Sequence, residues 1–255
     1  MKNRIFVIDG SSYLYRAYHA MPPLSTSSGQ PTGAVKGVTN MLMNLKKDSE
    51  GSPIIVVFDA KGKTFRSDYY KDYKANRPPM PNELRSQISD IKELTKLFKL
   101  HSEEVVGVEA DDVIATLAKC FGSKHKVLIS SPDKDLAQLV TDKVIQHNSM
   151  SDDFFDEAKV LEKFGVMPNQ INELLALVGD KADNIPGITK VGPKTAAKWL
   201  NEYGSIDALI DSIDQIKGVV GDNLRNEQEY IKRNLFLVSL KEDLDLKLSI
   251  QDVSL

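Results

Sequence analysis

Short apolar runs recur along the first part of the chain, and each one leads into polar residues followed by a helical pattern. Continuous apolar runs of this length predict strands buried on both faces of a sheet. The predicted strands are Arg4–Ile8, Pro53–Phe58, Glu103–Gly107, Lys126–Ser130 and Lys143–His147. Because strands and helices alternate, we predict an α/β fold with a central, mostly parallel sheet and helices on both faces.

Segments with helical periodicity lie between these strands and make up the rest of the chain after them. Between the strands the pattern predicts helices from Ser11 to about Ala20, over Ala34–Lys47, over Glu83–Leu100 and over residues 109–121. After Asp156 only helices are expected, over Glu157–Phe164, Asn169–Val178, residues 193–200, Ile206–Ile213 and Asn223–Leu240. We therefore divide the chain into an α/β part, residues 1–155, and a helical part, residues 156–255.

Acidic residues follow the predicted strands at equivalent places. Asp9 and Asp59 come directly after two strands, residues 107–118 (GVEADDVIATLA) bring Glu109, Asp111 and Asp112, and the fourth strand leads to Asp133 and Asp135. A simpler interpretation of the central group is that acids cap a helix N-terminus. Yet parallel strands end at one edge of a sheet, so all of these acids should converge, together with Asp180 and Asp183. Their mutual repulsion predicts bound hard cations such as Mg²⁺.

A basic and aromatic stretch, Lys61–Arg77, follows the second strand. If it is one helix, then Arg66, Tyr70, Lys74 and Arg77 share a face, and Pro78, Pro79 and Pro81 end it. Cations interleaved with aromatic rings suit a nucleic-acid backbone and unstacked bases. The alternative is a solvated surface helix whose tyrosines pack on the core.

A glycine-rich turn, GITKVGPKT (187–195), resembles a phosphate loop, but Pro193 breaks the spacing and no buried strand precedes it. We interpret it as a hairpin between two helices. Backbone N–H groups after Gly192 could bind a DNA phosphate, with added charge from Lys190, Lys194 and Lys198. An ordinary helix-to-helix turn is the alternative.

Composition adds limits to this picture. The 255 residues are 41% hydrophobic and 27% charged with a net charge of −3, so no overall basic field indicates nucleic acid. The apolar run near the N-terminus is too short for a signal peptide or a membrane span, so we expect a cytoplasmic, non-membrane protein. The single cysteine, Cys120, is expected to be a buried structural thiol. The four histidines are scattered and form no zinc motif.

Six motifs resemble the 5′-nuclease domain of bacterial DNA polymerase I, that is, the flap endonuclease family. They are VIDGSSYLYRAYHAMPPL, VVFDAKGKTFR, YKANRPPMP, GVEADDVIATLA, DKDLAQLV and LVGDKADNIPGITKVGPKTAAKWL. The resemblance runs from about residue 4 to the C-terminus. It implies a structure-specific 5′→3′ exonuclease and flap endonuclease that acts in replication and repair by a two-metal mechanism, with two Mg²⁺ (or Mn²⁺) ions.

The resemblance also implies roles for individual residues. One metal site would use Asp9, Asp59, Glu109 and Asp111, and the second Asp111, Asp112, Asp133, Asp135 and Asp183, with Asp180 in support. Lys74 and Arg77 would act on the scissile phosphate. Residues of about 60–85 would form a helical arch, with Arg66, Tyr70 and Tyr73 contacting DNA. Residues of about 174–200 would form a helix–three-turn–helix motif that grips duplex DNA, with a bound K⁺. Ser131-Pro132 departs from the Thr-Gly pair that is more usual there.

The implied partners are DNA with single-strand/duplex junctions, such as 5′ flaps and nicks, and polymerase domains in the same or another chain. The protein itself is expected to be a monomer. Two alternatives stay open from the sequence: a non-catalytic module that binds DNA junctions, and a ribonuclease of the small α/β type, which would not need the arch or the hairpin.

Overall fold

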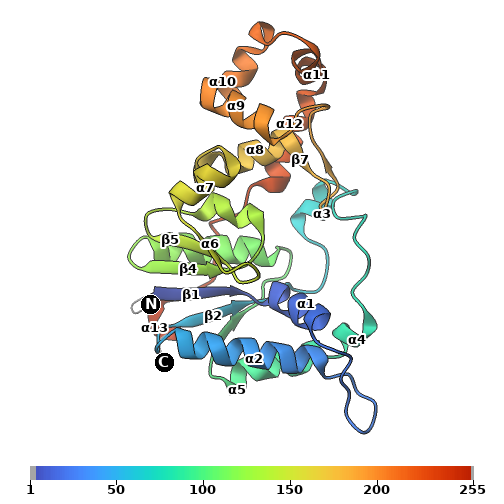
Figure 1. Cartoon of the computed structure of the whole chain (residues 1–255), viewed down its shortest axis with the longest axis vertical. Helices are drawn as coiled ribbons and strands as arrows, with labels where there is room; N and C mark the ends of the chain where they lie inside the picture. The colour runs from blue at the N-terminus through green and yellow to red at the C-terminus, as the bar shows by residue number, and fades with distance from the viewer. Residues whose placement is uncertain (1–3, 254–255) are drawn as a thin grey trace.

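The computed structural model describes residues 4–253 and contains a six-stranded sheet in the order β3-β2-β1-β4-β5-β6 (Figure 1). The strands β1 to β5 are parallel, and β6 is antiparallel to β5. Their bounds are Arg4–Asp9 (β1), Ile54–Val57 (β2), His101–Glu103 (β3), Lys126–Ser130 (β4), Val144–Asn148 (β5) and Asp153–Phe155 (β6). The predicted parallel sheet is confirmed, and β6 is an edge strand that the sequence did not indicate.

Helices cover both faces of the sheet, as predicted. One face packs on α1 (Gly10–Ala20), α2 (Gly33–Asp48) and α5 (Ile88–Leu97), with Phe6, Ile8 and Val56 in their shared core. The other face packs on α6 (Ala110–Gly122), and residues 240–253, including α13 (Ile250–Val253), cover the same core. Both faces of the sheet are therefore covered, which explains why the sequences of the buried strands are continuous apolar runs.

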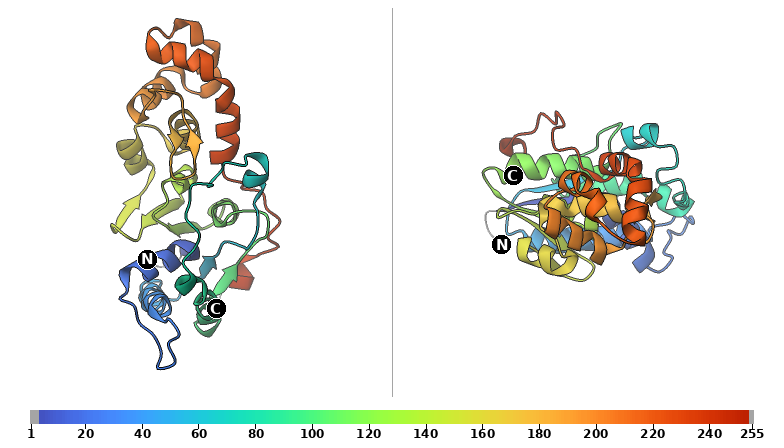
Figure 2. Two further views of the ribbon diagram at one scale, coloured as in Figure 1. Left: turned by 90° about the vertical axis from the view of Figure 1, so that its right-hand side faces the viewer. Right: turned by 90° about the horizontal axis from the view of Figure 1, so that it is seen from above.

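The helical part forms a separate core beyond the sheet edge (Figures 1 and 2). It contains α7 (Glu157–Phe164), α8 (Ile171–Val178), α9 (Pro193–Tyr203), α10 (Ile206–Asp211), α11 (Val219–Glu227) and α12 (Glu229–Val238). Between α8 and α9 lies a small hairpin, β7 (Gly179–Asp180) and β8 (Ile185–Pro186). A side chain on Gly187 would lie 2.0 Å from the Val178 carbonyl oxygen, so the two arms of the hairpin can approach only because glycine stands there.

The predicted strand Glu103–Gly107 is wrong beyond its first residue, because β3 ends at Glu103. Gly107 instead has a φ of +88°, which turns the chain, and its carbonyl accepts a hydrogen bond from the N–H of Phe65. The sheet edge is thereby connected to the basic segment that follows β2.

The arch implied over residues of about 60–85 does not contain the single helix considered over Lys61–Arg77. It contains α3 (Phe65–Tyr69) and α4 (Asn82–Arg85), joined by turns and an extended segment (Figure 1). Lys74 has a φ of +56°, and its N–H donates to the Asp183 carbonyl at 2.9 Å. Tertiary hydrogen bonds to the β7–β8 turn thus override the helical pattern.

Three smaller expectations change as well. The helix expected over Glu83–Leu100 is divided into α4 and α5, and the helix expected over Asn223–Leu240 is divided into α11 and α12. Cys120 is exposed rather than buried, since it lies on the outer side of the last turn of α6. Among residues 4–253, no helix is long and apolar enough to cross a bilayer.

Candidate active site

One cavity of about 420 Å³ collects carboxylates from both parts of the chain. Strand ends and the helices after them supply Asp9, Asp59, Asp111, Asp133 and Asp135, and the β7–β8 turn supplies Asp180 and Asp183. The predicted convergence is therefore present. It arises because β1, β2 and β4 are parallel and adjacent, so that their carboxyl ends meet at one edge.

Local hydrogen bonds fix several of these carboxylates. Asp9 is the last residue of β1 and the N-cap of α1: its Oδ1 accepts from Ser12 N–H at 2.8 Å, and its Oδ2 from Ser131 Oγ at 2.7 Å. Asp59 Oδ1 accepts from the N–H of Ala110 at 2.9 Å, which joins the end of the second strand to the start of α6. Acids at strand ends thus serve both as helix caps and as cavity walls.

Gathering these carboxylates in a buried cavity raises the pKa of several of them. Burial raises the pKa of Asp9 to about 6, against the lowering effect of its hydrogen bonds from Ser12 and Ser131. Burial and then repulsion from Asp133 raise the pKa of Asp111 and of Asp135 well above the ordinary value. Asp135 Oδ1 is buried and has no hydrogen-bond partner within residues 4–253. The cavity wall is therefore short of positive charge and of hydrogen-bond donors.

Cationic side chains from the arch reach the same wall. Lys74 Nζ lies 2.6 Å from Glu109 Oε1 and 3.7 Å from Asp183 Oδ2, and Arg77 pairs with Asp183. Lys134 Nζ lies 2.6 Å from Asp180 Oδ2. Lys74 and Arg77 line the cavity itself, so the structure places the two predicted catalytic cations beside the acids.

Asp112 does not face this cavity, which corrects its expected place in the second metal site. Its side chain is fully buried, and its carboxylate accepts from Arg66 at 2.6 and 2.8 Å and from the N–H groups of Glu109 and Lys241 at 3.1 and 2.9 Å. All of its strong acceptor positions are thus occupied by protein donors. Neighbouring helical residues point about 100° apart, which sends Asp111 to the cavity and Asp112 away from it.

Two predicted DNA contacts are corrected for the same reason, because their side chains are buried. Arg66 is 1% exposed and is fully engaged by Asp112, Glu109 and the carbonyls of Leu237 and Ser239. Tyr73 is buried, and its hydroxyl donates toward Glu109 and Asp183 at 3.0 and 3.2 Å. Tyr70 stays half-buried under Arg233.

The hairpin residues lie apart from the acids, at the start of α9. Gly192 is the N-cap of α9, and Lys190, Lys194 and Lys198 are exposed and make no ion pair among residues 4–253. Lys194 and Lys198 line a second cavity, of about 500 Å³, together with Lys217. The sequence analysis missed Lys217, which is 19 positions after Lys198 and reaches the groove only through the fold.

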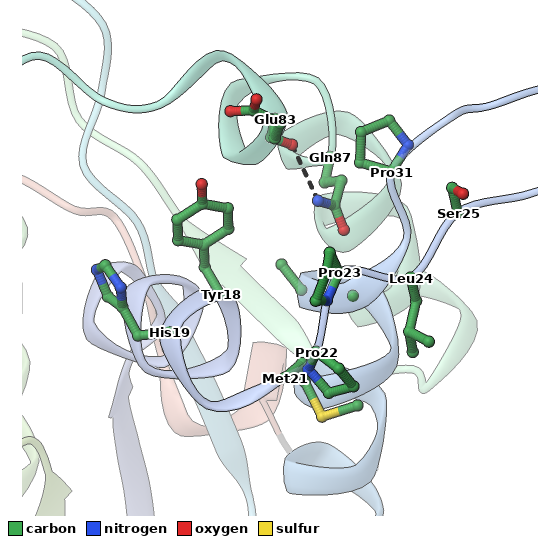
Figure 3. Close-up of a pocket in the computed structure, with 12 residues that line it drawn as sticks. Tyr18, His19, Met21, Pro22, Pro23, Leu24, Ser25, Pro31, Glu83 and Gln87 are labelled. Atoms are coloured by element: carbon green, nitrogen blue, oxygen red, sulfur yellow. Dashed lines mark hydrogen bonds between the residues drawn. The ribbon is translucent and has the colours of Figure 1, made fainter.

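A third cavity, of about 440 Å³, lies at the C-terminal end of α1 and is mostly apolar (Figure 3). Prolines of the loop between α1 and α2, such as Pro22 and Pro23, line it with Tyr18 and Gln87. Gln87 donates to the Glu83 carbonyl at 2.9 Å and accepts from the Val35 N–H at 3.1 Å. With Glu83 as its one lining acid, this cavity has no chemistry like that of the carboxylate cavity.

The residues of the carboxylate cavity suit a hard divalent cation. Among residues 4–253, no three Asp, Glu, His or Cys side chains form a closely packed metal-binding group. Mg²⁺, however, keeps most of its water and is commonly bound by one or two carboxylates together with a substrate phosphate. The acids that line the cavity offer oxygen atoms as ligands, and the buried Asp135 Oδ1 has no hydrogen-bond partner in the part of the chain that the structure describes. Both features match such an ion rather than zinc.

Comparison with known proteins identifies relatives over the whole described chain. The family model described as "5′-3′ exonuclease, N-terminal resolvase-like domain" matches residues 4–165, and "5′-3′ exonuclease, C-terminal SAM fold" matches residues 166–255. A 5′-3′ exonuclease of Aquifex aeolicus is 46% identical over 252 residues, covering 98% of this chain and 86% of its own. DNA polymerase I of Pseudomonas aeruginosa is 46% identical over 255 residues, covering 96% of this chain but 28% of its own length.

Solved structures agree with this assignment. T5 5′-exonuclease, in a structure titled as having divalent metal ions (zinc) bound, aligns with a TM-score of 0.77 and 27% identity over 93% of this chain and 90% of its own. The catalytic core of Rad2 in complex with DNA substrate aligns with a TM-score of 0.59 and 15% identity over 89% of this chain and 73% of its own, which supports the fold alone. From both family models and the relatives of high identity, the chain belongs to the 5′-3′ exonuclease family.

Proposed function

We propose that this protein is a structure-specific 5′→3′ exonuclease and flap endonuclease that hydrolyses DNA phosphodiesters at single-strand/duplex junctions with the help of divalent cations, in replication and repair. The observation that carries the proposal is the single cavity in which carboxylates from three strand ends and from the β7–β8 turn meet the cations Lys74 and Arg77. A module that only binds DNA gains nothing from so many acids facing a polyanion, which disfavours that alternative.

The residues that would hold the metal follow from the cavity wall. Asp9, Asp59, Asp111, Asp133, Asp135 and Asp183 line the cavity and would hold the ions, while Asp180 is paired with Lys134. Bound there, two Mg²⁺ or Mn²⁺ ions would supply positive charge to stabilise the oxygens that gain charge during phosphodiester hydrolysis. Glu109, expected in the first metal site, does not line the cavity, and its carboxylate accepts from Arg66, Tyr73 and Lys74. Asp112 is not part of this set, because its carboxylate is occupied by Arg66.

The chain's own cations position the phosphate. Lys74 and Arg77 belong to the arch and line the cavity, and each pairs there with Asp183. A scissile phosphate that enters between the acids and the arch can exchange one of these carboxylate contacts for its own oxygens. The two side chains would then fix its orientation and stabilise the charge that develops on it.

A test of the proposal measures release of a labelled 5′ end from a flap substrate. The protein should cleave in Mg²⁺, lose cleavage in EDTA, and regain it when Mg²⁺ or Mn²⁺ is added back. Binding to the same substrate in EDTA serves as the control for an intact protein. Binding without any cleavage in Mg²⁺ or Mn²⁺ would instead favour the non-catalytic junction module.

Lys74→Ala is expected to lower the turnover number on a flap by about 100-fold or more, because it removes a charge that acts on the phosphate. The melting temperature should fall moderately, because the neighbouring Glu109 and Asp183 raise the pKa of Lys74 and lose a cation in this variant, so turnover is measured well below the melting transition. Lys71→Ala is the matched control, because Lys71 is an exposed lysine of the same segment that forms no ion pair within residues 4–253. Equal turnover in the two variants would remove Lys74 from the mechanism.

The proposal also includes a binding site for the duplex part of the substrate, at the start of α9. The exposed Lys190, Lys194 and Lys198, with the helix start at Gly192, would hold the duplex arm by its phosphates. A K⁺ at the hairpin belongs to the same proposal, and weaker duplex binding when Li⁺ replaces K⁺ would support it. Since the chain spans 28% of the polymerase I relative, polymerase domains are proposed partners, in the same or another chain. The monomeric state and cytoplasmic location stay predictions from the sequence.

A further inference from the structure

Aromatic side chains of α3 and α12, far apart in the sequence, meet on the surface. Tyr69 and Phe236 are 56% and 41% exposed, and their ring centroids lie 4.2 Å apart. Phe65 meets Phe236 edge-on at 5.6 Å. We call these three residues, with Tyr70 and Tyr230, the α3–α12 aromatic patch. Exposed rings gathered in this way are unusual on a soluble protein and mark an interaction surface.

Two cations lie on these rings instead of on carboxylates. The Arg233 guanidinium lies over Tyr70 at 4.7 Å and over Tyr230 at 4.8 Å, and Lys241 Nζ lies over Phe65 at 4.3 Å. Within residues 4–253, neither Arg233 nor Lys241 forms an ion pair with an acid. The patch therefore combines flat apolar faces with positive charge that the protein does not neutralise, which favours a partner with both rings and negative charge.

The patch is continuous with the carboxylate cavity along the chain. Tyr70 and Lys74 are four residues apart, so their Cα atoms are separated by at most about 14 Å. Lys74 lines the cavity, while Tyr69 and Tyr70 lie at the other end of the same segment. In Figure 2 the end of α12 comes down beside α3, at the base of the arch. A strand leaving the cavity past the arch would reach these rings within a few nucleotides.

We propose that the α3–α12 aromatic patch binds the unpaired bases of the single-stranded 5′ flap. Bases would stack on Tyr69 and Phe236, and the flap phosphates would lie near Arg233 and Lys241. Stacking of this kind does not depend on sequence, because every base has a flat π-face. The duplex-binding lysines of α9 are separate from the patch, so the two surfaces would bind different parts of one substrate. This inference rests on the proposed function.

The test compares binding of two substrates that differ only in the flap, measured by fluorescence anisotropy in EDTA, so that no cleavage is needed. One carries a single-stranded 5′ flap of about ten nucleotides and the other is the same duplex with a nick. The Tyr69→Ala/Phe236→Ala double variant is expected to bind the flap substrate about 10-fold or more weakly. Its affinity for the nicked duplex should equal that of the parent protein, and the single variant Tyr69→Phe should bind the flap as the parent does because it keeps the ring.

Phe154→Ala is the matched control, because Phe154 is 40% exposed on β6 and stacks on His147 outside the patch. The inference is overturned if the double variant binds the flap as tightly as the parent, or if it loses the same factor on the nicked duplex. A parent protein that binds both substrates but cleaves neither in Mg²⁺ or Mn²⁺ would contradict the proposed nuclease function, while the flap-specific loss would still support the patch.

Discussion

Asp111→Asn is expected to lower DNA cleavage by about 1,000-fold or more while making the metal-free protein more stable than its parent. Asp111 lines the cavity at the start of α6, between the acids from the strand ends. Burial and repulsion from Asp133 and Asp9 raise its pKa well above the ordinary value. Asparagine keeps the shape but removes the charge, so the repulsion between the acids falls at the same time as the capacity to hold a cation.

The stability gain has a definite pH dependence. At low pH the carboxyl group of Asp111 is protonated in both the folded and the unfolded protein, and its contribution is then at its most favourable. As the pH rises above the unfolded value of about 3.9, the unfolded chain loses the proton first, and the parent loses stability until the raised folded pKa is passed. The difference in melting temperature between Asp111→Asn and the parent should therefore grow with rising pH.

The measurement combines cleavage of a flap in Mg²⁺ with thermal unfolding in EDTA across this pH range. Asp142→Asn is the matched control, because Asp142 is an exposed carboxylate outside the cavity. It should change neither property. Turnover within about 10-fold of the parent would remove Asp111 from the metal-binding set, and a lower melting temperature at neutral pH would contradict the electrostatic description of the cavity.

The strand-end acids could be predicted because their position depends on chain topology alone. Once β1, β2 and β4 are recognised as parallel buried strands, any residue directly after them must lie at the same edge. Asp9, Asp59 and Asp133 follow from this rule without knowledge of side-chain directions. Asp180 and Asp183 needed a different signal, the resemblance to known motifs, because no sheet rule joins the β7–β8 turn to that edge.

The direction of neighbouring side chains could not be predicted in the same way. Asp111 and Asp112 are adjacent acids at one helix start, yet one faces the cavity and the other faces Arg66. A basic residue 46 positions earlier decides between them, and the sequence alone gives no sign of that contact. A helix face shared by four residues of the arch was expected from their spacing, namely Arg66, Tyr70, Lys74 and Arg77. That face does not form, because hydrogen bonds to the β7–β8 turn fix the backbone after α3.

Surface features formed by segments far apart in the chain also could not be predicted from the sequence. The α3–α12 aromatic patch depends on Tyr69 meeting Phe236, 167 positions later, and the second cavity depends on Lys217 lining the same space as Lys198. Neither pair stands out in its own segment, where single exposed aromatic or basic residues are ordinary. Basic and aromatic residues in the arch did indicate nucleic acid, but the fold decided which of them stay exposed.

Asp112→Ala is expected to destabilise the protein by about 3–5 kcal/mol, because it leaves the Arg66 guanidinium buried without its anion. The pair lies at a junction of three segments. Arg66 belongs to α3, Asp112 to α6, and both bind backbone groups at the end of α12 and beyond, at Leu237, Ser239 and Lys241. A buried ion pair with this many hydrogen bonds holds the arch base against the helix that carries Glu109 and Asp111.

Urea unfolding of four variants separates this structural role from a metal-binding role. Arg66→Met combined with Asp112→Leu should recover much of the stability that Asp112→Ala loses, since apolar side chains can replace a buried ion pair but not half of one. Glu242→Ala, which breaks the exposed pair with Lys119, should cost less than about 1 kcal/mol and serves as the control. Asp112→Asn decides the question. If Asp112 is a structural anion, this variant unfolds at lower urea but binds Mn²⁺ as the parent does. Parent-like stability with weakened Mn²⁺ binding would return Asp112 to the metal site.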